Sequence, residues 1–530
     1  MGKTAWAVAL AALWWGAAMA HAVAHDALPP IPERAPEEGF QAVPAPWRDY
    51  YLQAREAERI DDRLARCLAY PDLPDNDWPA GHAEAHCRFH MLQPLSLATF
   101  ADQLDRGEGQ ALDELLDGLL AKHYSVDGGE DIHVAIEAFD ASEEAGRLSE
   151  RWLQLAPRSP YAHIARANHY RAAAWKARGD RWAEETPREQ LRRMSALVAQ
   201  AVPLFRKAIA LEPRLMPAYV GMLDVAMLDS QLATEREAYQ GAMAQDPTCL
   251  EFARQRMQSL TPRWGGGYED MLSFGVQLSG HVARRPQLAI HIAAPYGDRG
   301  DRLMKDGEFT RDTVEVFDIA LRIGSNESHL RDAANVILNL PESDGGPERW
   351  RGVALLLQEQ RFNTTNAWAH RQIAWQLLHD EPEWALRHAL LAVELEPDDA
   401  WGRFMAGSAY YVTRQAEKAE PHFLVAARDS TQRRPSLLSL GSLWMFDAGL
   451  EARAAATRAK PYVDQLLSEY PQDGRGWLLR ISVASVLDGV VDPEMARTFL
   501  AYADRSDPLQ AEVAASMEAA GLVAPAGERP

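Results

Sequence analysis

Residues 400–426 read AWGRFMAGSAYYVTRQAEKAEPHFLVA, and the spacing of small and aromatic residues within them decides the fold. Small and aromatic side chains follow one another at intervals of 3, 9, 4 and 3 residues: Gly407, Tyr410, Ala419, Phe423 and Ala426. Small residues let two helices approach closely, and aromatic rings fill the space between one helix pair and the next. The stretch therefore predicts two antiparallel helices that stack on similar neighbours.

The same pattern recurs at a period of 34 residues. Phe205, Ala208 and Pro213 return as Tyr239, Ala242 and Pro247, and Ala385, Ala389 and Ala392 return as Ala419, Phe423 and Ala426. A period of 34 residues is typical of stacked helix hairpins. Pro213, Pro247 and Pro397 are expected just beyond the second helix of a pair, because proline cannot continue the helical hydrogen bonds. Leu155-Ala156-Pro157 indicates another such end.

On these residues the chain resembles tetratricopeptide-repeat proteins. It is also similar to secreted bacterial proteins of this repeat class with uncharacterised function, some of which carry a turn like Trp264-Gly265-Gly266-Gly267-Tyr268. The resemblance spans about residues 150–480, with firm motifs near 201–247 and 385–426. It implies an all-α, right-handed α-solenoid of irregular helix pairs with an N-terminal helical cap. It also implies a ligand groove along the first helix of each pair, and it implies no activity.

The sequence divides into seven segments. They are a signal peptide (1–20), a Pro-rich tether (21–46), an N-terminal helical region (47–150), tetratricopeptide-like repeats (151–262), an irregular helical middle segment (263–345), C-terminal repeats (346–505) and a C-terminal helix with a tail (506–530). In the middle segment, residues 295–300 (PYGDRG) read as a turn between helices. No run of alternating apolar and polar β-branched residues predicts a strand.

The first twenty residues have the features of a secretory signal. Lys3 gives a positive start, residues 5–18 are apolar, and Ala18-Met19-Ala20 offers small residues at a cleavage site. No later stretch reads as long and apolar enough to cross a bilayer, so we expect no membrane span after cleavage. The expected location is the periplasm or the exterior of the cell.

Charge restricts the class of partner. The chain has a net charge of −21, and removal of Lys3 with the leader makes it −22, while 47% of its residues are hydrophobic. Nucleic acids and anionic membranes attract clustered Lys and Arg. The composition therefore excludes nucleic acid and favours a protein or peptide partner, with the oligomeric state left open.

Three cysteines are present. Cys67 and Cys87 flank a loop without regular periodicity, and in an oxidising compartment they are expected to form a disulfide. Cys249 follows Pro247 and is then left over, most simply as a small buried apolar residue.

Eight residues are candidates for partner binding. They come from the expected groove helices and the Gly-rich turn: Asn168, Arg171, Asp224, Trp401, Phe404, Tyr411, Trp264 and Tyr268. Asn168 and Arg171 share a helix face suited to a carboxylate. The competing interpretation is that the rings pack in the core and the polar groups are solvated.

A histidine cluster carries the alternative function. His82, His86 and His90 recur every four residues and would share one helix face, where two imidazoles can hold a transition metal. No nearby carboxylate triad completes a hydrolytic site, and Gly-x-Ser-x-Gly, His-Glu-x-x-His and Cys-x-x-Cys motifs are absent from the sequence.

We therefore predict an exported, non-enzymatic scaffold that binds a protein segment, in a role such as envelope assembly, with no cofactor and no assigned metal. The alternative is a metal-binding protein or hydrolase at the three histidines.

Overall fold

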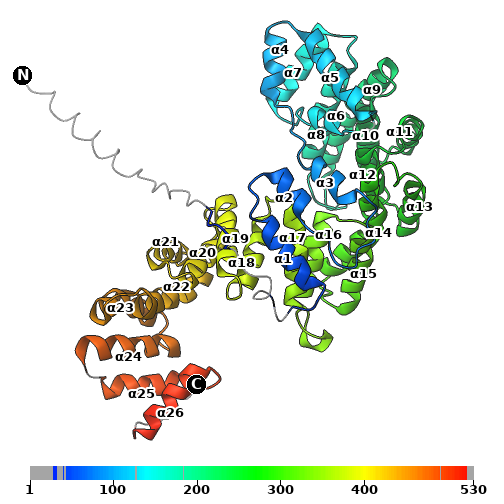
Figure 1. Ribbon diagram of the computed structural model, residues 1–530. Helices are drawn as coiled ribbons and strands as arrows, with labels where there is room; N and C mark the ends of the chain where they lie inside the picture. Colours follow the sequence, from blue (N-terminus) through cyan, green and yellow to red (C-terminus); the bar gives the residue numbers. More distant parts are fainter. Residues whose placement is uncertain are drawn as a thin grey trace, which may run out of the picture. The chain divides into compact units, whose positions relative to one another are not determined.

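The computed structural model describes residues 28–32, 40, 43–125, 128–182, 184–489 and 491–521, and these residues contain helices and no strand. The predicted signal peptide and most of the predicted tether lie outside this range. Two compact units are distinguished: Pro36–Thr364, called here the N-terminal unit, and Thr365–Pro530 together with Met1–Ala35, called the C-terminal unit (Figure 1).

Most helices of the N-terminal unit pack as successive antiparallel pairs. In chain order they are α1 (Trp47–Ala57), α2 (Arg63–Ala69), α3 (His82–Phe89), α4 (Leu97–Asp105), α5 (Gly109–His123), α6 (Asp131–Ile136), α7 (Glu143–Leu155), α8 (Pro160–Arg178), α9 (Arg188–Leu211), α10 (Met216–Leu228), α11 (Leu232–Gln245), α12 (Leu250–Ser259), α13 (Tyr268–Ser279), α14 (Ala289–Lys305), α15 (Arg311–Ile323), α16 (Glu327–Leu338) and α17 (Arg349–Phe362). The strongest pairings join α8 with α9, α10 with α11, α14 with α15 and α16 with α17.

The C-terminal unit continues in the same manner. Its helices are α18 (Ala367–Leu377), α19 (Pro382–Leu395), α20 (Ala400–Val412), α21 (Ala416–Ala426), α22 (Ser430–Ser442), α23 (Ala452–Glu469), α24 (Gly474–Asp488), α25 (Pro493–Tyr502) and α26 (Pro508–Ala519). Each of α18, α20, α22 and α24 packs against the helix that follows it. The prediction of an all-α solenoid built from irregular helix pairs is confirmed.

Proline positions mark the helix ends as expected. α7, α9, α11 and α19 each end two residues before a proline, namely Pro157, Pro213, Pro247 and Pro397. Helix α23 ends in the same way before Pro471, a position outside the predicted set. The missing N–H and the ring of proline stop the helix, so one short signal sets the boundary of five helices.

Residues 295–300 do not form a turn, and that prediction was wrong. They lie inside α14, where Gly297 and Gly300 face neighbouring helices. A Cβ on Gly297 would fall about 2 Å from the His329 ring, and one on Gly300 would fall 2.8 Å from Phe317. These glycines permit close helix packing rather than a change of chain direction. As a consequence, the charged residues between and after them lie on one continuous helix.

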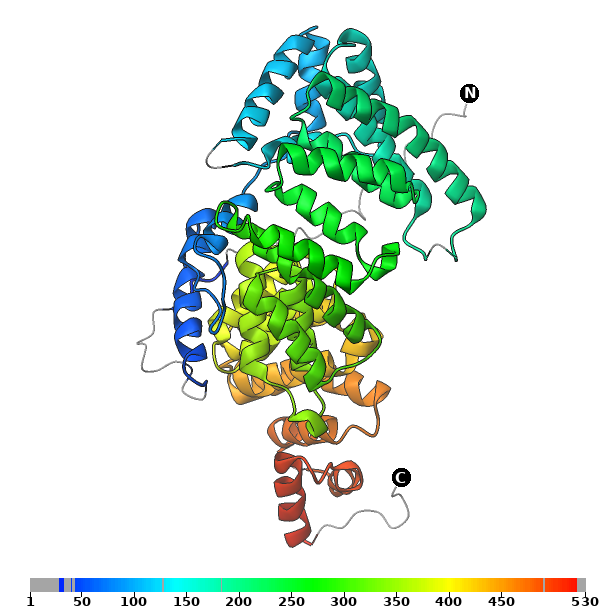
Figure 2. The same ribbon diagram turned by 90° about the vertical axis from the view of Figure 1, so that its right-hand side faces the viewer.

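Helices α1–α3 lie beside α17, which is close to 300 residues later in the sequence (Figures 1 and 2). The hydroxyl of Tyr50 donates to the carbonyl of Ala354 at 3.0 Å, and that of Tyr51 donates to the carbonyl of Trp350 at 2.5 Å. The Arg361 guanidinium donates to the Cys67 carbonyl at 2.8 Å. The N-terminal helices therefore belong to the packing of the later repeats.

The structure changes two other expectations, one about membrane-spanning segments and one about the Pro-rich tether. Within the described part of the chain, α9 is long and apolar enough by composition to cross a membrane, contrary to the expectation that no such segment follows the leader. In the structure its Val198, Ala201 and Phe205 are buried in the repeat core. In the predicted tether, Leu28 packs against the core of the C-terminal unit and Ile31 is buried.

Cys67 and Cys87 form a disulfide that joins α2 to α3. Both cysteines are buried against Phe362 of α17. Closing a loop of this length stabilises a fold by about 3 kcal/mol, mainly by restricting the unfolded chain.

Reduction is therefore expected to lower the protection of α2 and α3 against hydrogen exchange by about that amount, whereas exchange in α20–α23 stays unchanged. The Cys67→Ala/Cys87→Ala variant provides the matched control, because dithiothreitol should not affect it. Equal exchange of α2 and α3 with and without reductant in the wild type would contradict the prediction.

Candidate functional site

The first helices of successive pairs line two adjoining cavities in the N-terminal unit. The larger cavity, of about 990 Å³, lies between the end of α8, the end of α12 and the C-terminal half of α14. The smaller one, of about 400 Å³, continues along α12, α14 and the start of α16. The two share five lining residues: Gln258, Thr261, Asp298, Asp301 and Lys305. We call this continuous depression the inner groove.

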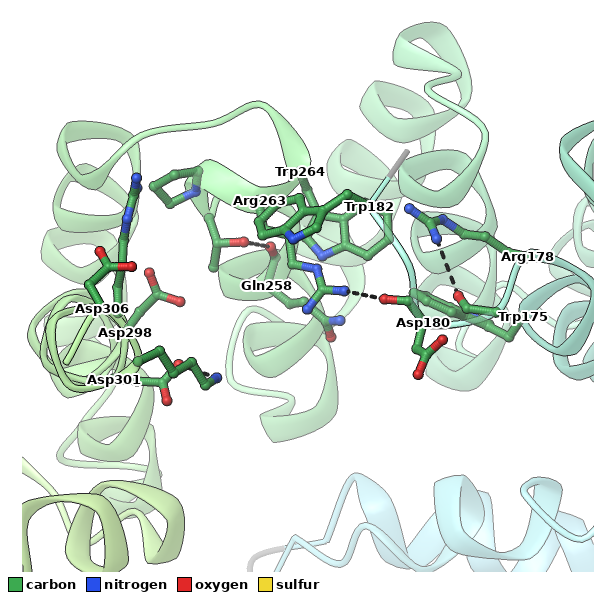
Figure 3. Close-up of a pocket in the computed structure, with 15 residues that line it drawn as sticks. Trp175, Arg178, Asp180, Trp182, Gln258, Arg263, Trp264, Asp298, Asp301 and Asp306 are labelled. Carbon is green, nitrogen blue, oxygen red and sulfur yellow. Dashed lines mark hydrogen bonds and ion pairs between the residues drawn. The ribbon is translucent and has the colours of Figure 1, made fainter. Parts of the chain in front are cut away.

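Three tryptophans form one wall of the inner groove (Figure 3). Trp175 and Trp264 pack edge to face with centroids 5.5 Å apart, and the Arg178 guanidinium lies 5.5 Å from the centre of the Trp264 ring. Trp182 is 54% exposed, with Arg263 5.2 Å from its ring centre. Aromatic faces held by flanking guanidinium groups are rigid and offer a large apolar area to a ligand.

The Gly-rich turn positions Trp264. Gly265 has φ of +89°, a conformation that glycine adopts without strain. A Cβ on Gly266 would lie 2.2 Å from the carbonyl oxygen of Leu260, so only glycine fits there. This tight turn returns the chain from α12 into α13 and leaves the Trp264 ring at the groove. Gly265 and Gly266 therefore permit the turn that places Trp264 in the aromatic wall.

Helix α14 supplies the opposite, charged wall. Asp298, Asp301 and Asp306 face the tryptophans across the cavity, and Lys305 donates to Asp301 at 2.7 Å (Figure 3). Burial raises the pKa of Asp298. Arg302 and Lys305 line this wall beside the three carboxylates, so it carries charges of both signs. A groove with one aromatic wall and carboxylates on the other can take a segment that carries an apolar side chain next to a basic one.

Of the eight predicted partner-binding residues, Trp264 lines the inner groove. Tyr268 is not among the residues that line it; its ring packs against the core at the start of α13, and burial raises its pKa. Trp175, Trp182, Arg263 and the α14 carboxylates line the groove as well, and they are not among the eight predicted residues. Arg263 directly precedes Trp264, and this position was a signal for it in the sequence. The carboxylates could not be assigned to one helix face, because the mistaken turn at 295–300 interrupted the helix that carries them.

Asn168, Arg171 and Asp224 do come together, but they bind one another. Arg171 donates to Asn168 Oδ1 at 2.7 Å, to Asp224 Oδ2 at 2.9 Å and to Glu137 Oε1 at 2.7 Å. The Asn168 amide donates to the carbonyl of Ile136 at 3.0 Å. The carboxylate for which this pair was suited is thus the chain's own, and the three residues form an internal network. Their role in partner binding stays a prediction.

Trp401, Phe404 and Tyr411 belong to the C-terminal unit. All three are partly buried and pack against its core. Phe404 contacts Phe423 with ring centroids 5.6 Å apart, and the Arg371 guanidinium lies 5.8 Å from the centre of the Trp401 ring. The core interpretation of these aromatics fits their contacts better than partner binding does.

The three predicted histidines have different surroundings, and only two of them approach the same carboxylate. His82 is buried with both ring nitrogens engaged: Nδ1 lies 3.0 Å from the Pro286 carbonyl, and Nε2 accepts from the Ser325 N–H at 3.3 Å. Burial lowers its pKa to about 4. His82 is therefore excluded as a metal ligand, whereas His86 and His90 both approach Glu327 of α16.

Cys249 has polar neighbours, contrary to its expected apolar role. Its sulfur lies 3.5 Å from His133 Nε2 and 3.7 Å from Glu130 Oε2, and it accepts from the Phe252 N–H at the start of α12. Burial raises the pKa of this thiol. Close by, the His123 ring bonds to Asp246 Oδ2 at 3.1 Å. The hydrogen bonds to Asp246 outweigh its burial and lower its pKa to about 2.

Residues 91–231 match a family model. Its description is a domain of unknown function, DUF4034. The match covers about a quarter of the chain, from the segment before α4 to the end of α10, and contributes the α8 side of the inner groove. The parts of the groove on α12, α14 and α16 lie beyond it.

No curated protein matches the chain. Among solved structures, one described as Naa15/Naa10 bound to HypK-THB is 10% identical, with 80% of this chain and 96% of that chain covered. The TM-score is 0.23, so this likeness supports no conclusion about function.

Proposed function

We propose that this chain is an exported scaffold that binds a segment of another protein in the inner groove, without catalysis. The observation that carries the proposal is the wall of three tryptophans facing the carboxylates of α14 across a cavity of about 990 Å³. Buried aromatic anchors supply most of the energy of such contacts, and charged neighbours fix the direction of the bound chain. The preferred segment carries an aromatic or aliphatic side chain followed closely by Lys or Arg.

Export is supported by the leader-like N-terminus and by the Cys67–Cys87 disulfide, because disulfides persist in oxidising compartments. The net charge of −21 supports a neutral or basic protein partner over nucleic acid. An exported scaffold of this kind suits a role in envelope assembly. No catalytic motif occurs in the sequence, which supports a role in binding alone.

The test is selection of peptides from a displayed random library on the mature wild-type protein. Trp182→Ala and Trp264→Ala should each weaken the selected peptides at least tenfold, because loss of an aromatic anchor costs about 2 kcal/mol. Asp301→Asn should weaken basic peptides more than neutral ones, and this difference should shrink at high salt.

The matched control is Val276→Ala, which removes an exposed apolar side chain from α13 outside the groove lining. Its affinities should equal those of the wild type. Selection of no peptide, or of peptides that bind the Trp182→Ala protein equally well, would refute the proposal.

A further inference from the structure

Outside the inner-groove lining, a second group of side chains converges where α3 meets α16. His86 and His90 lie one helical turn apart at the end of α3, and Glu327 is the first residue of α16. One ligand atom from each of the three lies within 4.8 Å of the other two. The Cys67–Cys87 disulfide holds α3 beside α2, and it therefore also holds the two histidines of α3 in place.

The contacts within this group do not have the geometry of hydrogen bonds. His86 Nε2 lies 3.1 Å from Glu327 Oε1, and His90 Nε2 approaches the same oxygen. None of these three atoms has a hydrogen-bond partner, and neither has His86 Nδ1. Burying polar atoms without partners costs free energy, and the His86 side chain is only 5% exposed. A cation between His86 Nε2, His90 Nε2 and Glu327 Oε1 would satisfy these three atoms at once.

The buried cluster around Cys249 differs in this respect. There His123 bonds to Asp246 and to the Gly129 carbonyl, and Cys249 accepts from the Phe252 N–H. Those atoms already have partners within the chain, so they gain little from a metal. The comparison favours the α3–α16 group as the metal site.

We propose that His86, His90 and Glu327 bind one divalent transition-metal ion of the zinc type. Two imidazole nitrogens and one carboxylate oxygen suit such an ion, whereas calcium and magnesium prefer oxygen ligands throughout. Cys87 cannot contribute a thiolate because it is in the disulfide. His90 and Glu327 are 24% and 18% exposed, so water can reach the site to complete the coordination of the ion.

The site connects with the inner groove through α16. Glu327 lies between Asn326 and Ser328, which both line the smaller cavity. A bound ion would therefore fix the start of α16, and with it one end of the groove, to the N-terminal helices. This role extends the proposed scaffold without depending on peptide binding.

The experiment uses the full mature chain, prepared without a histidine tag, stripped with EDTA and dialysed against Zn²⁺ or Co²⁺. We expect one equivalent of zinc by elemental analysis and visible Co²⁺ absorption without a thiolate charge-transfer band. His90→Gln and Glu327→Gln should weaken zinc at least tenfold, and zinc should raise the unfolding temperature of the wild type but not of these variants. His379→Gln, at an exposed histidine elsewhere, should behave as the wild type.

Unfolding of the metal-free variants at the same temperature as the metal-free wild type shows that they are folded. Less than a tenth of an equivalent of zinc in the wild type would overturn the proposal. So would zinc that survives Glu327→Gln but is lost in Cys249→Ser, together with a thiolate band from Co²⁺, because the ion would then occupy the other cluster.

Discussion

Replacing Asp224 with alanine is expected to lower the stability of the segment around α8, α10 and α12 by about 3–5 kcal/mol. Asp224 is 3% exposed and accepts from Arg171 at 2.9 Å, Trp175 at 2.8 Å and Gln255 at 3.1 Å. Its removal leaves a partly buried guanidinium with half its countercharge and the partly buried Trp175 N–H without its acceptor. The buried Gln255 amide keeps only the Met227 sulfur, at 3.8 Å. Each group left unsatisfied in this way carries a desolvation cost.

Asp224→Asn keeps the shape and one acceptor but removes the charge, so we expect a smaller loss. The matched control is Glu137→Ala, which removes the other carboxylate bound to Arg171. Glu137 is exposed, and screened ion pairs contribute at most about 1 kcal/mol. Because a solenoid unfolds in parts, native-state hydrogen exchange of α8, α10 and α12 is the appropriate measurement. Similar losses for Asp224→Ala and Glu137→Ala would show that the network does not stabilise the fold in this way.

Phe423→Ala should destabilise the C-terminal unit by about 3–5 kcal/mol, the usual cost of emptying a buried aromatic site. Phe423 is fully buried against Gly407, where a Cβ would lie 2.8 Å from its ring. Gly407→Ala should therefore cost about 1–3 kcal/mol through overpacking. When Gly407→Ala is combined with Phe423→Leu, the loss should be less than the sum of the two single losses, because the smaller side chain relieves the contact.

Phe446→Ala is the control, since this phenylalanine lies in the same unit with its ring exposed. It should change stability by no more than about 0.5 kcal/mol. Hydrogen exchange of α20 and α21, with thermal unfolding of the whole chain, measures these effects. Additive losses from Gly407→Ala and Phe423→Leu would argue against direct packing of the two positions.

The sequence predicted the fold more closely than the site. Gly407 and Phe423 are close enough in sequence for their spacing to reveal a helix pair, and prolines after α9, α11 and α19 mark helix ends by a local effect. The same local reasoning failed at residues 295–300, because glycine is both a turn former and a residue that permits close packing. Only the neighbouring helices decide between these roles.

The site depends on contacts that no local pattern contains. The spacing of the histidines predicted a cluster on α3. Glu327, however, comes from a helix more than 230 residues later, and no local pattern indicates it. His82 is not part of the group, because its Nε2 accepts a hydrogen bond from the Ser325 N–H. Asn168 and Arg171 were recognised as suited to a carboxylate, and the structure provides that carboxylate from the chain itself. A side chain's chemistry is visible in the sequence, whereas its availability depends on what it meets after folding.

The sequence by itself determined the all-helical class, the pairing of neighbouring helices and the ends of four helices before prolines, because these depend on residues within about one repeat of one another. Tertiary structure alone decided which polar groups remain available: it joined Asp224 to Arg171, set the tryptophans opposite α14 and brought Glu327 to His86 and His90. The reason is physical. Burial and partner distance set the energy of a polar group, and both arise only when distant helices pack together.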